Sequence, residues 1–356
     1  MNLGLVRKAA HRTTRRLREL WVSMKIEHLC GPRHIRLAPN EAVVTCVVKN
    51  GGFYIEEFIA HYLKLGCRHI FLLDNGSTDQ TLDICKQNPN VTVFTSSLPI
   101  DANQAHFKRY LARNVASGGW CLDADIDEFL DFPLSAHLPF NRFLEYLNKN
   151  GFTGVITQLL DMFSNRPFSE LVDASGSLAS IYCCYDIGDV TKTVYHDSAI
   201  AKANGSANRV THPDTCLFWG GIRRTLYGNN CLLTKHSLFR LGKGVKPFPH
   251  VHFMDNVALA DVSCVMRHYK LTSNAIDVAN QNREHFTTNS KGYDDFIGFL
   301  KEQWNSPIEG PNVAKWNGVD ELVNQGFLFV SENYRNYVSA QAGTETTRTK
   351  RPVMTA

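Results

Sequence analysis

The chain has 356 residues, of which 44% are hydrophobic and 20% charged, so it is long enough for one large α/β domain with additions or for two modest domains. Its net charge of +4 is unevenly placed, because residues 1–36 hold nine Lys or Arg and only two acids. The remainder is close to neutral, which excludes a protein that binds nucleic acid through a basic field over its whole surface.

The first 40 residues form a basic segment. Residues 3–26 alternate basic and apolar side chains, a pattern typical of an amphipathic helix that lies on an anionic membrane surface. Two interpretations stay open: peripheral contact with the inner face of a membrane, or a solvated helix that packs on the body of the protein.

From residue 42 the pattern becomes a regular alternation of strands and helices. Apolar, β-branched runs predict buried strands, and apolar positions three or four apart predict helices. The predicted strands are 42–48, 69–73, 91–94, 120–124 and 154–160, and the predicted helices are 54–65, 80–86, 104–115 and 293–303. This order predicts an α/β fold with a doubly wound, mostly parallel sheet, in which ligands bind at the carboxyl ends of the strands.

After residue 150 the rhythm loosens. Residues 161–260 mix Gly, Asn, His and short apolar runs, which is typical of an irregular region that covers a site. We expect a main domain over 41–305, a C-terminal extension over 306–342 and a disordered tail over 343–356.

The ten cysteines are scattered, and none forms a C-x-x-C pair, which leaves a zinc ribbon unsupported. Several lie inside apolar runs, where a thiol packs as a small hydrophobic group. We therefore expect reduced cysteines and a cytoplasmic protein. No apolar run reaches the roughly 18 to 20 residues that span a bilayer.

Four carboxylates end the predicted strand 120–124 and follow it: Asp123, Asp125, Asp127 and Glu128. Clustered carboxylates repel one another and are costly to desolvate without a cation. If the strand continues to about Asp125, alternation puts the three aspartates on one side, where Mg²⁺ or Mn²⁺ would find oxygen ligands. A solvated acidic turn is the alternative. A structural Ca²⁺ site is less favoured, because the segment lacks the glycine and the further acids of a calcium loop.

A second acidic turn follows the predicted strand 69–73. Asp74 ends that strand, Asp79 opens the next helix, and Asn75 follows Asp74 directly. A carboxylate at this edge can accept hydrogen bonds from a ribose or a base. The alternative is a plain turn with helix caps. Because both acidic turns fall at carboxyl ends of strands, together they favour a nucleotide site.

Six stretches, in this order, resemble bacterial glycosyltransferases of the family 2-like group, which is related to the family 92 (DUF23-like) group. They are 47–66, 71–81, 120–130, 219–224, 233–240 and 266–270. The resemblance covers roughly residues 42–300 and implies a GT-A fold with an irregular C-terminal acceptor side. One departure is Gly51, where many relatives carry an acid after Lys-Asn.

The resemblance implies that a sugar moves from a UDP- or GDP-sugar to a hydroxyl of a glycan acceptor, in cell-surface or exopolysaccharide synthesis. Asp125 and Asp127 would hold Mn²⁺ or Mg²⁺, which offsets charge on the departing nucleoside diphosphate. His268 is a candidate late metal ligand, and His250 and His252 are rivals for that role.

The nucleotide itself would contact two further groups of residues. Asp74, Asn75 and Asp79 would line the base and ribose pocket. Arg223 and Arg224, which follow a Gly-Gly turn, would pair with phosphate oxygens, although two surface arginines are an equally good interpretation.

The resemblance favours an inverting enzyme, which needs a general base for the acceptor. Asp161, just after a predicted strand, is the first candidate, and Asp186 and Asp189 are weaker ones. Two other functions stay open. A nucleotidyltransferase would carry a Gly-rich phosphate loop after the first strand, which 49–53 matches poorly, and the third is a non-catalytic carbohydrate-binding protein.

Overall fold

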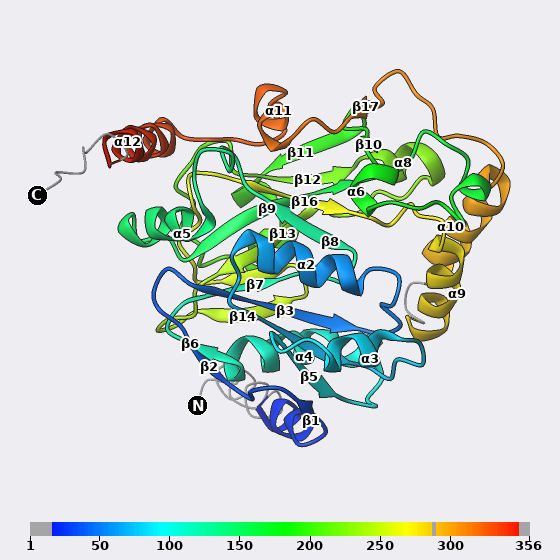
Figure 1. Cartoon of the computed structure of the whole chain (residues 1–356), viewed down its shortest axis with the longest axis horizontal. Coiled ribbons are helices and arrows are strands. Elements are labelled where there is room, and N and C mark those ends of the chain that lie inside the picture. The colour runs from blue at the N-terminus through cyan, green and yellow to red at the C-terminus, as the bar shows by residue number, and fades with distance from the viewer. Residues whose placement is uncertain (1–15, 287–289, 349–356) are drawn as a thin grey trace, which may run out of the picture.

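The computed structural model describes residues 16–286 and 290–348. At its centre is a nine-stranded sheet (Figure 1). Its strands are, from one edge to the other, β1 (Glu27–Cys30), β5 (Val91–Thr95), β4 (His69–Asp74), β3 (Ala42–Val48), β7 (Trp120–Asp123), β13 (Thr234–Phe239), β9 (Gly154–Asp161), β16 (Cys264–His268) and β8 (Glu128–Asp131). Strands β5, β4, β3, β7, β9 and β16 run in one direction, and β1, β13 and β8 run in the other. The predicted α/β class with a mostly parallel sheet is confirmed.

Helices cover both faces of this sheet. They are α2 (Ile55–Leu65), α3 (Thr81–Lys86), α4 (Ile100–Asn114) and α5 (Phe140–Lys149). Alternate residues of a strand face opposite sides, so Val44 packs in one core with Phe58 of α2, whereas Val43 packs in another with Phe107 of α4. Because both faces are covered, β3 is an almost continuous apolar run.

The second half of the chain adds short elements around the sheet. Two-stranded ribbons pair β2 (Ile35–Arg36) with β6 (Ala116–Ser117), β10 (Cys184–Tyr185) with β17 (Ala314–Lys315), β11 (Val190–Val194) with β12 (Cys216–Gly220), and β14 (Lys246–His250) with β15 (Phe253–Asp255). Short helices are α6 (Leu178–Ile181), α7 (Ala199–Asn204), α8 (Ile222–Tyr227) and α11 (Val319–Asn324), with 3₁₀ turns η1 (Phe168–Glu170) and η2 (Tyr195–Asp197). This agrees with the irregular region expected from the sequence.

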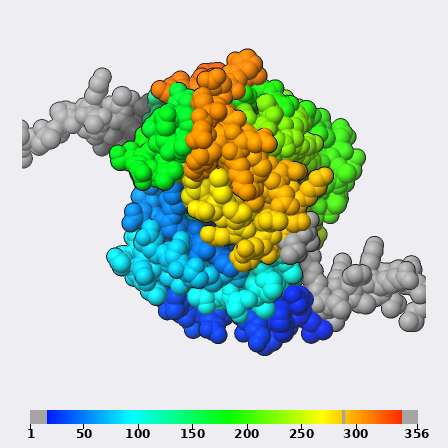
Figure 2. Space-filling model, turned by 90° about the vertical axis from the view of Figure 1, so that its right-hand side faces the viewer, coloured from blue at the N-terminus to red at the C-terminus, as the bar shows by residue number. Residues whose placement is uncertain are grey.

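Two longer helices close one end of the molecule. α9 (Ala275–His285) and α10 (Ser290–Gln303) pack against each other and share an apolar cluster with Phe163 and Ile222. In Figure 2 they lie within the yellow and orange region of the face that is turned toward the viewer, above the blue and cyan N-terminal half. They lie beside the carboxyl ends of the parallel strands (Figure 1).

The ends of the chain bear on the predicted boundaries. Residues 16–23 are helical, while residues 1–15 of the basic segment lie outside the described residues. Helix α12 (Glu332–Arg348) reaches into the range expected to be a disordered tail, of which 349–356 lie outside the described residues. No helix among the described residues is long and apolar enough to cross a membrane. All ten cysteines are free thiols.

Candidate active site

A cavity of about 220 Å³ opens at the carboxyl edge of the sheet. Five parts of the chain line its inner side: the end of β3 with the residues after it, Asn75 after β4, the first turn of α4, the segment 125–127, and the two residues His268 and Lys270 at and beyond the end of β16. Residues of α9 and α10 form its outer wall. A second cavity of about 540 Å³ shares Lys49, Asn75, Ile100 and His285 with the first, so the two adjoin, and we refer to them together as the cleft.

The connector 124–127 carries the acidic cluster along this edge. It leaves β7 after Asp123 and enters β8 at Glu128, and three strands lie between β7 and β8 in the sheet. Asp125 therefore meets the start of β13, and Asp127 meets the end of β16. The strand ends at Asp123, and Asp123 and Asp125 meet at Lys108 whereas Asp127 faces His268.

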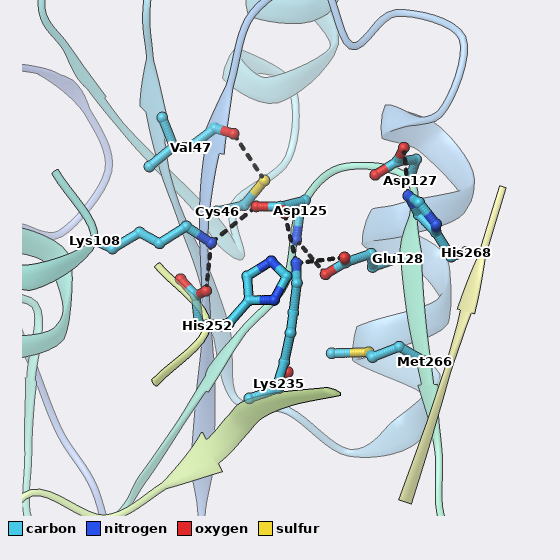
Figure 3. A network of polar contacts seen from close by, with 12 residues as sticks. Cys46, Val47, Lys108, Asp125, Asp127, Glu128, Lys235, His252, Met266 and His268 are labelled. Carbon is cyan, nitrogen blue, oxygen red and sulfur yellow. Dashed lines mark hydrogen bonds and ion pairs between the residues drawn. The ribbon is translucent and has the colours of Figure 1, made fainter. Parts of the chain in front are cut away.

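Asp125 is held between two lysines. Its Oδ1 accepts a hydrogen bond from Lys108 Nζ at 2.9 Å, and its Oδ2 accepts one from Lys235 Nζ at 2.6 Å (Figure 3). Both lysines are buried, with 1% and 4% of their side chains exposed. Burial raises the pKa of Asp125, but the two ammonium groups outweigh it and hold that pKa well below its usual range.

The same lysines bind two further carboxylates. Lys108 Nζ lies 2.6 Å from Asp123 Oδ2, and Lys235 Nζ lies 2.5 Å from Glu128 Oε1. We call these five residues the lysine cage. Because each ammonium is shared, two positive charges offset three negative ones within the cage. A metal that bound Asp125 would share its oxygens with the two ammonium groups.

Asp127 faces the cavity in a different arrangement. Its Oδ2 lies 3.3 Å from His268 Nε2, and the backbone N–H of Tyr269 donates to its carbonyl oxygen at 2.8 Å. In Figure 3 this pair stands apart from the lysine cage, with the carboxylate turned toward the imidazole. The pKa of Asp127 is lowered, because the attraction of His268 outweighs burial, and the pKa of His268 is raised to about 9 by its carboxylate partners in spite of burial.

The other nitrogen of His268 is fixed by Asp161. Nδ1 lies 2.6 Å from Asp161 Oδ1, and Asp161 Oδ2 accepts a hydrogen bond from Arg223 Nε at 2.7 Å. Both Asp161 and Arg223 are buried, and Arg223 and His268 hold the pKa of Asp161 well below its usual range although burial opposes them. A carboxylate on the far nitrogen of a histidine is the usual support of a metal-binding imidazole.

Asp127 and His268 form a two-residue donor set that fits a divalent ion, which would displace the proton held on Nε2. An oxygen and an imidazole nitrogen on one cavity wall suit Mn²⁺, and a diphosphate and water would supply the remaining ligands. Asp125, the third predicted ligand, lines the same cavity, and each of its oxygens accepts a hydrogen bond from a lysine. No group of three or more His, Cys, Asp or Glu suited to a metal occurs among residues 16–286 and 290–348.

The turn after β4 is held by side-chain hydrogen bonds, and only part of it reaches the cavity. Asp74 accepts hydrogen bonds from the backbone N–H groups of Gly76 and Ser77, and Asp79 accepts one from the N–H of Gly52 at 2.8 Å. These carboxylates shape the loops and do not line the cavity. Asn75 does line it, and its amide is anchored on the carbonyl oxygens of Ser96 and Leu98.

Several predicted residues lie away from the cavity. Arg224 of α8 pairs with Asp189, which directly precedes β11, at 2.5 Å, and Asp186 accepts a hydrogen bond from the N–H of Gly188. His252 stands beside Lys235 in the lysine cage, and its Nδ1 has no hydrogen-bond partner among the described residues (Figure 3).

Three lysines and one asparagine were missed by the sequence analysis. Lys108 and Lys235 form the cage, Lys270 lines the cavity, and Asn50 joins the turn to α9 through Thr78 and Gln281. Lys270 alone had a signal in the sequence, because it stands two residues after His268 and alternation puts both on one side of a strand. Burial and the nearby Arg223 lower the pKa of Lys270.

No family model and no curated protein matches the chain. Among solved structures, the mannosyltransferase PcManGT from Pyrobaculum calidifontis, in complex with GDP-Man and Mn²⁺, is 14% identical over 98% of both chains, with a TM-score of 0.31. S. aureus TarS is 15% identical over 46% of this chain, with a TM-score of 0.29, and the match spans only 27% of TarS. At scores this low, neither structure says what this chain binds.

Proposed function

We propose that the chain is a metal-dependent glycosyltransferase that moves a sugar from a nucleotide sugar to a glycan hydroxyl. One observation carries the proposal: Asp127 and His268, which are 141 positions apart, meet 3.3 Å apart on the wall of a cleft at the carboxyl edge of an α/β sheet. Ligands of doubly wound folds bind at this edge. The acceptor class, a cell-surface or exported polysaccharide, rests on the family resemblance alone.

The cleft offers two chemically different ends for such a donor. Toward Lys49, Asn50 and Asn75 it presents amides and apolar surface from Ile100, which suit a nucleoside. Toward Asp127 and His268 it presents groups that suit a metal and a diphosphate. The phosphate role predicted for Arg223 and Arg224 finds less support, because both guanidinium groups are already paired with carboxylates.

Asp127 and His268 would hold the Mn²⁺ or Mg²⁺, and Asp161 would orient the imidazole. When bound, such an ion acts as a Lewis acid on the departing diphosphate. The contacts of Asp161 suit this orienting role better than that of a general base, because both of its oxygens are engaged. Asp161 and Asp186 as bases, and the inverting course itself, stay predictions.

We also propose that the N-terminal segment contacts the inner face of a membrane, which would put the enzyme on the cytoplasmic side. Leu17, Leu20 and Met24 share one face of the helix over residues 16–23 and the turn after it, and they are 60%, 61% and 73% exposed. The opposite face is fastened to α4, where Glu19 pairs with Arg113 at 3.0 Å. An exposed apolar stripe beside basic residues is typical of interfacial helices.

Thermal unfolding with nucleoside diphosphates, with and without Mn²⁺, tests the proposal. A donor that binds the folded chain raises the unfolding temperature, so the preferred base is the one that gives the largest Mn²⁺-dependent rise. The matching nucleotide sugar should then be turned over in the presence of Mn²⁺. A nucleotidyltransferase would instead need a sugar phosphate and a nucleoside triphosphate. Binding of glycans without any turnover would support the carbohydrate-binding alternative and contradict the proposal.

A further inference from the structure

Lys270 is a half-buried lysine whose charge has no carboxylate partner among the described residues. Its ammonium makes no ion pair within 4.0 Å among residues 16–286 and 290–348, although it lines the cavity beside His268. Lysine ammonium groups that leave bulk water are nearly always paired. The Lys270 ammonium is therefore suited to pair with a negatively charged group of a bound ligand.

The nearby carboxylates are already occupied. Asp161 gives one oxygen to His268 and the other to Arg223, and Asp127 turns to His268. The ammonium of Lys270 lies instead over two rings of α10, 5.7 Å from the centroid of Tyr293 and 5.6 Å from that of Phe296. These cation–π contacts hold the side chain in place and leave its N–H groups available to a ligand.

The backbone aims Lys270 at the same space as His268. β16 ends at His268, and the next side chain, Tyr269, points to the opposite side, where its ring packs 5.1 Å from that of Phe129. Alternation then returns Lys270 to the cavity side. A ligand that reaches the Asp127–His268 pair thus comes within reach of Lys270.

We propose that Lys270 binds the sugar-proximal phosphate of the donor's diphosphate and stabilises it as it leaves, a role that rests on the glycosyltransferase function proposed above. A divalent ion beside one carboxylate leaves a single net positive charge, which is less than a diphosphate carries. Breaking the bond to the sugar adds one more negative charge to that phosphate. Lys270 supplies a fixed positive charge at this point, and such preorganised charge acts most strongly on the departing group.

Paired affinities for a nucleoside diphosphate and the matching monophosphate test this role. Lys270→Met removes the charge and keeps an apolar stem of similar length, and Lys270→Arg restores the charge. With saturating Mn²⁺, Lys270→Met should weaken diphosphate binding by about ten- to a hundredfold, as expected for a lost hydrogen bond between charged groups. Monophosphate binding should change much less, and Lys270→Arg should recover most of the loss.

Two control variants separate this role from general effects of charge. Lys49→Met removes a lysine at the other end of the same cleft and should change both affinities by a similar factor. Lys301→Met removes an exposed lysine of α10 outside the cavity and should change neither. In turnover assays, Lys270→Met should lower kcat more than it raises KM, since the charge acts on the leaving group.

The ratio of the two affinities decides the outcome. If Lys270→Met keeps the wild-type ratio of diphosphate to monophosphate affinity while its unfolding temperature is unchanged, the assignment of Lys270 is overturned and the glycosyltransferase proposal stands. If the wild-type chain binds no nucleoside diphosphate at all, the proposed function falls, and the assignment falls with it.

Discussion

Replacing Asp125 and Asp127 one at a time should separate a structural from a functional aspartate. Asp125→Asn acts on the lysine cage, whereas Asp127→Asn acts on the two-residue donor set on the cavity wall. We expect the first variant to lose stability and keep Mn²⁺-dependent nucleotide binding. The second variant should unfold at nearly the wild-type temperature without ligand and lose Mn²⁺-dependent nucleotide binding.

The magnitude for Asp125→Asn follows from what remains in the cage. Lys108 keeps Asp123 at 2.6 Å, and Lys235 keeps Glu128 at 2.5 Å, so no ammonium is left unpaired. An asparagine oxygen replaces one of the two acceptors, so one charge-assisted hydrogen bond is lost, which costs about 1.5–3 kcal/mol. Relief of repulsion among three carboxylates offsets part of this cost. We expect a net loss of roughly 1–2 kcal/mol in the free energy of unfolding.

The assay is thermal unfolding of each variant with the preferred nucleoside diphosphate, with and without Mn²⁺. A ligand at about 100 times its Kd adds about 2.7 kcal/mol to the free energy of unfolding, which exceeds the loss expected for Asp125→Asn. The Mn²⁺-dependent rise should therefore survive in Asp125→Asn and vanish in Asp127→Asn. Loss of that rise in Asp125→Asn, with Asp127→Asn unaffected, would refute the division of roles.

Two further changes test the cage and the N-terminal segment. Lys108→Met leaves Asp123 buried without an ammonium, which should cost about 3–5 kcal/mol by denaturant unfolding. Burial already raises the pKa of Asp123, and loss of Lys108 raises it further, so the folded variant binds an extra proton as pH falls. Its deficit should thus be smaller at pH 5 than at pH 8, and a deficit that grows on acidification would contradict this. The double variant Leu20→Glu with Met24→Glu should no longer sediment with anionic vesicles. The control Leu29→Glu, at a residue exposed outside that helix, should still sediment. If both variants behave alike, the exposed apolar face of the N-terminal helix is not a membrane contact.

The parallel half of the fold could be predicted because its signals are local. β3 spans the predicted residues 42–48, since burial on both faces leaves a continuous apolar run. α4 begins at Ile100, four residues before the predicted start, because its first turn alternates apolar and polar residues and so lacks the apolar spacing of a helix. β13 enters the sheet between β7 and β9 from more than 70 residues further along the chain, and no local pattern encodes that insertion.

The sequence predicted where the candidate site lies but not the charged groups that surround its carboxylates. The acidic connector and the turn at Asp74 both lie at the carboxyl edge, as the alternation of strands and helices required. The lysines that neutralise Asp125 were not foreseen, because Lys108 and Lys235 are 17 and 110 residues away from it and lysines are rarely buried. A carboxylate motif alone therefore does not tell a metal ligand from one half of an internal ion pair.

The connector 124–127 crosses the ends of several strands, so the spacing of its two aspartates has to match the spacing of those strands. Asp125 is matched to β13 and Asp127 to β16, and β9 lies between those strands. One residue inserted between the aspartates would leave the composition of the motif intact and shift one carboxylate out of step with its strand. The number of residues between the two aspartates is therefore set by the distance from β13 to β16 across the sheet.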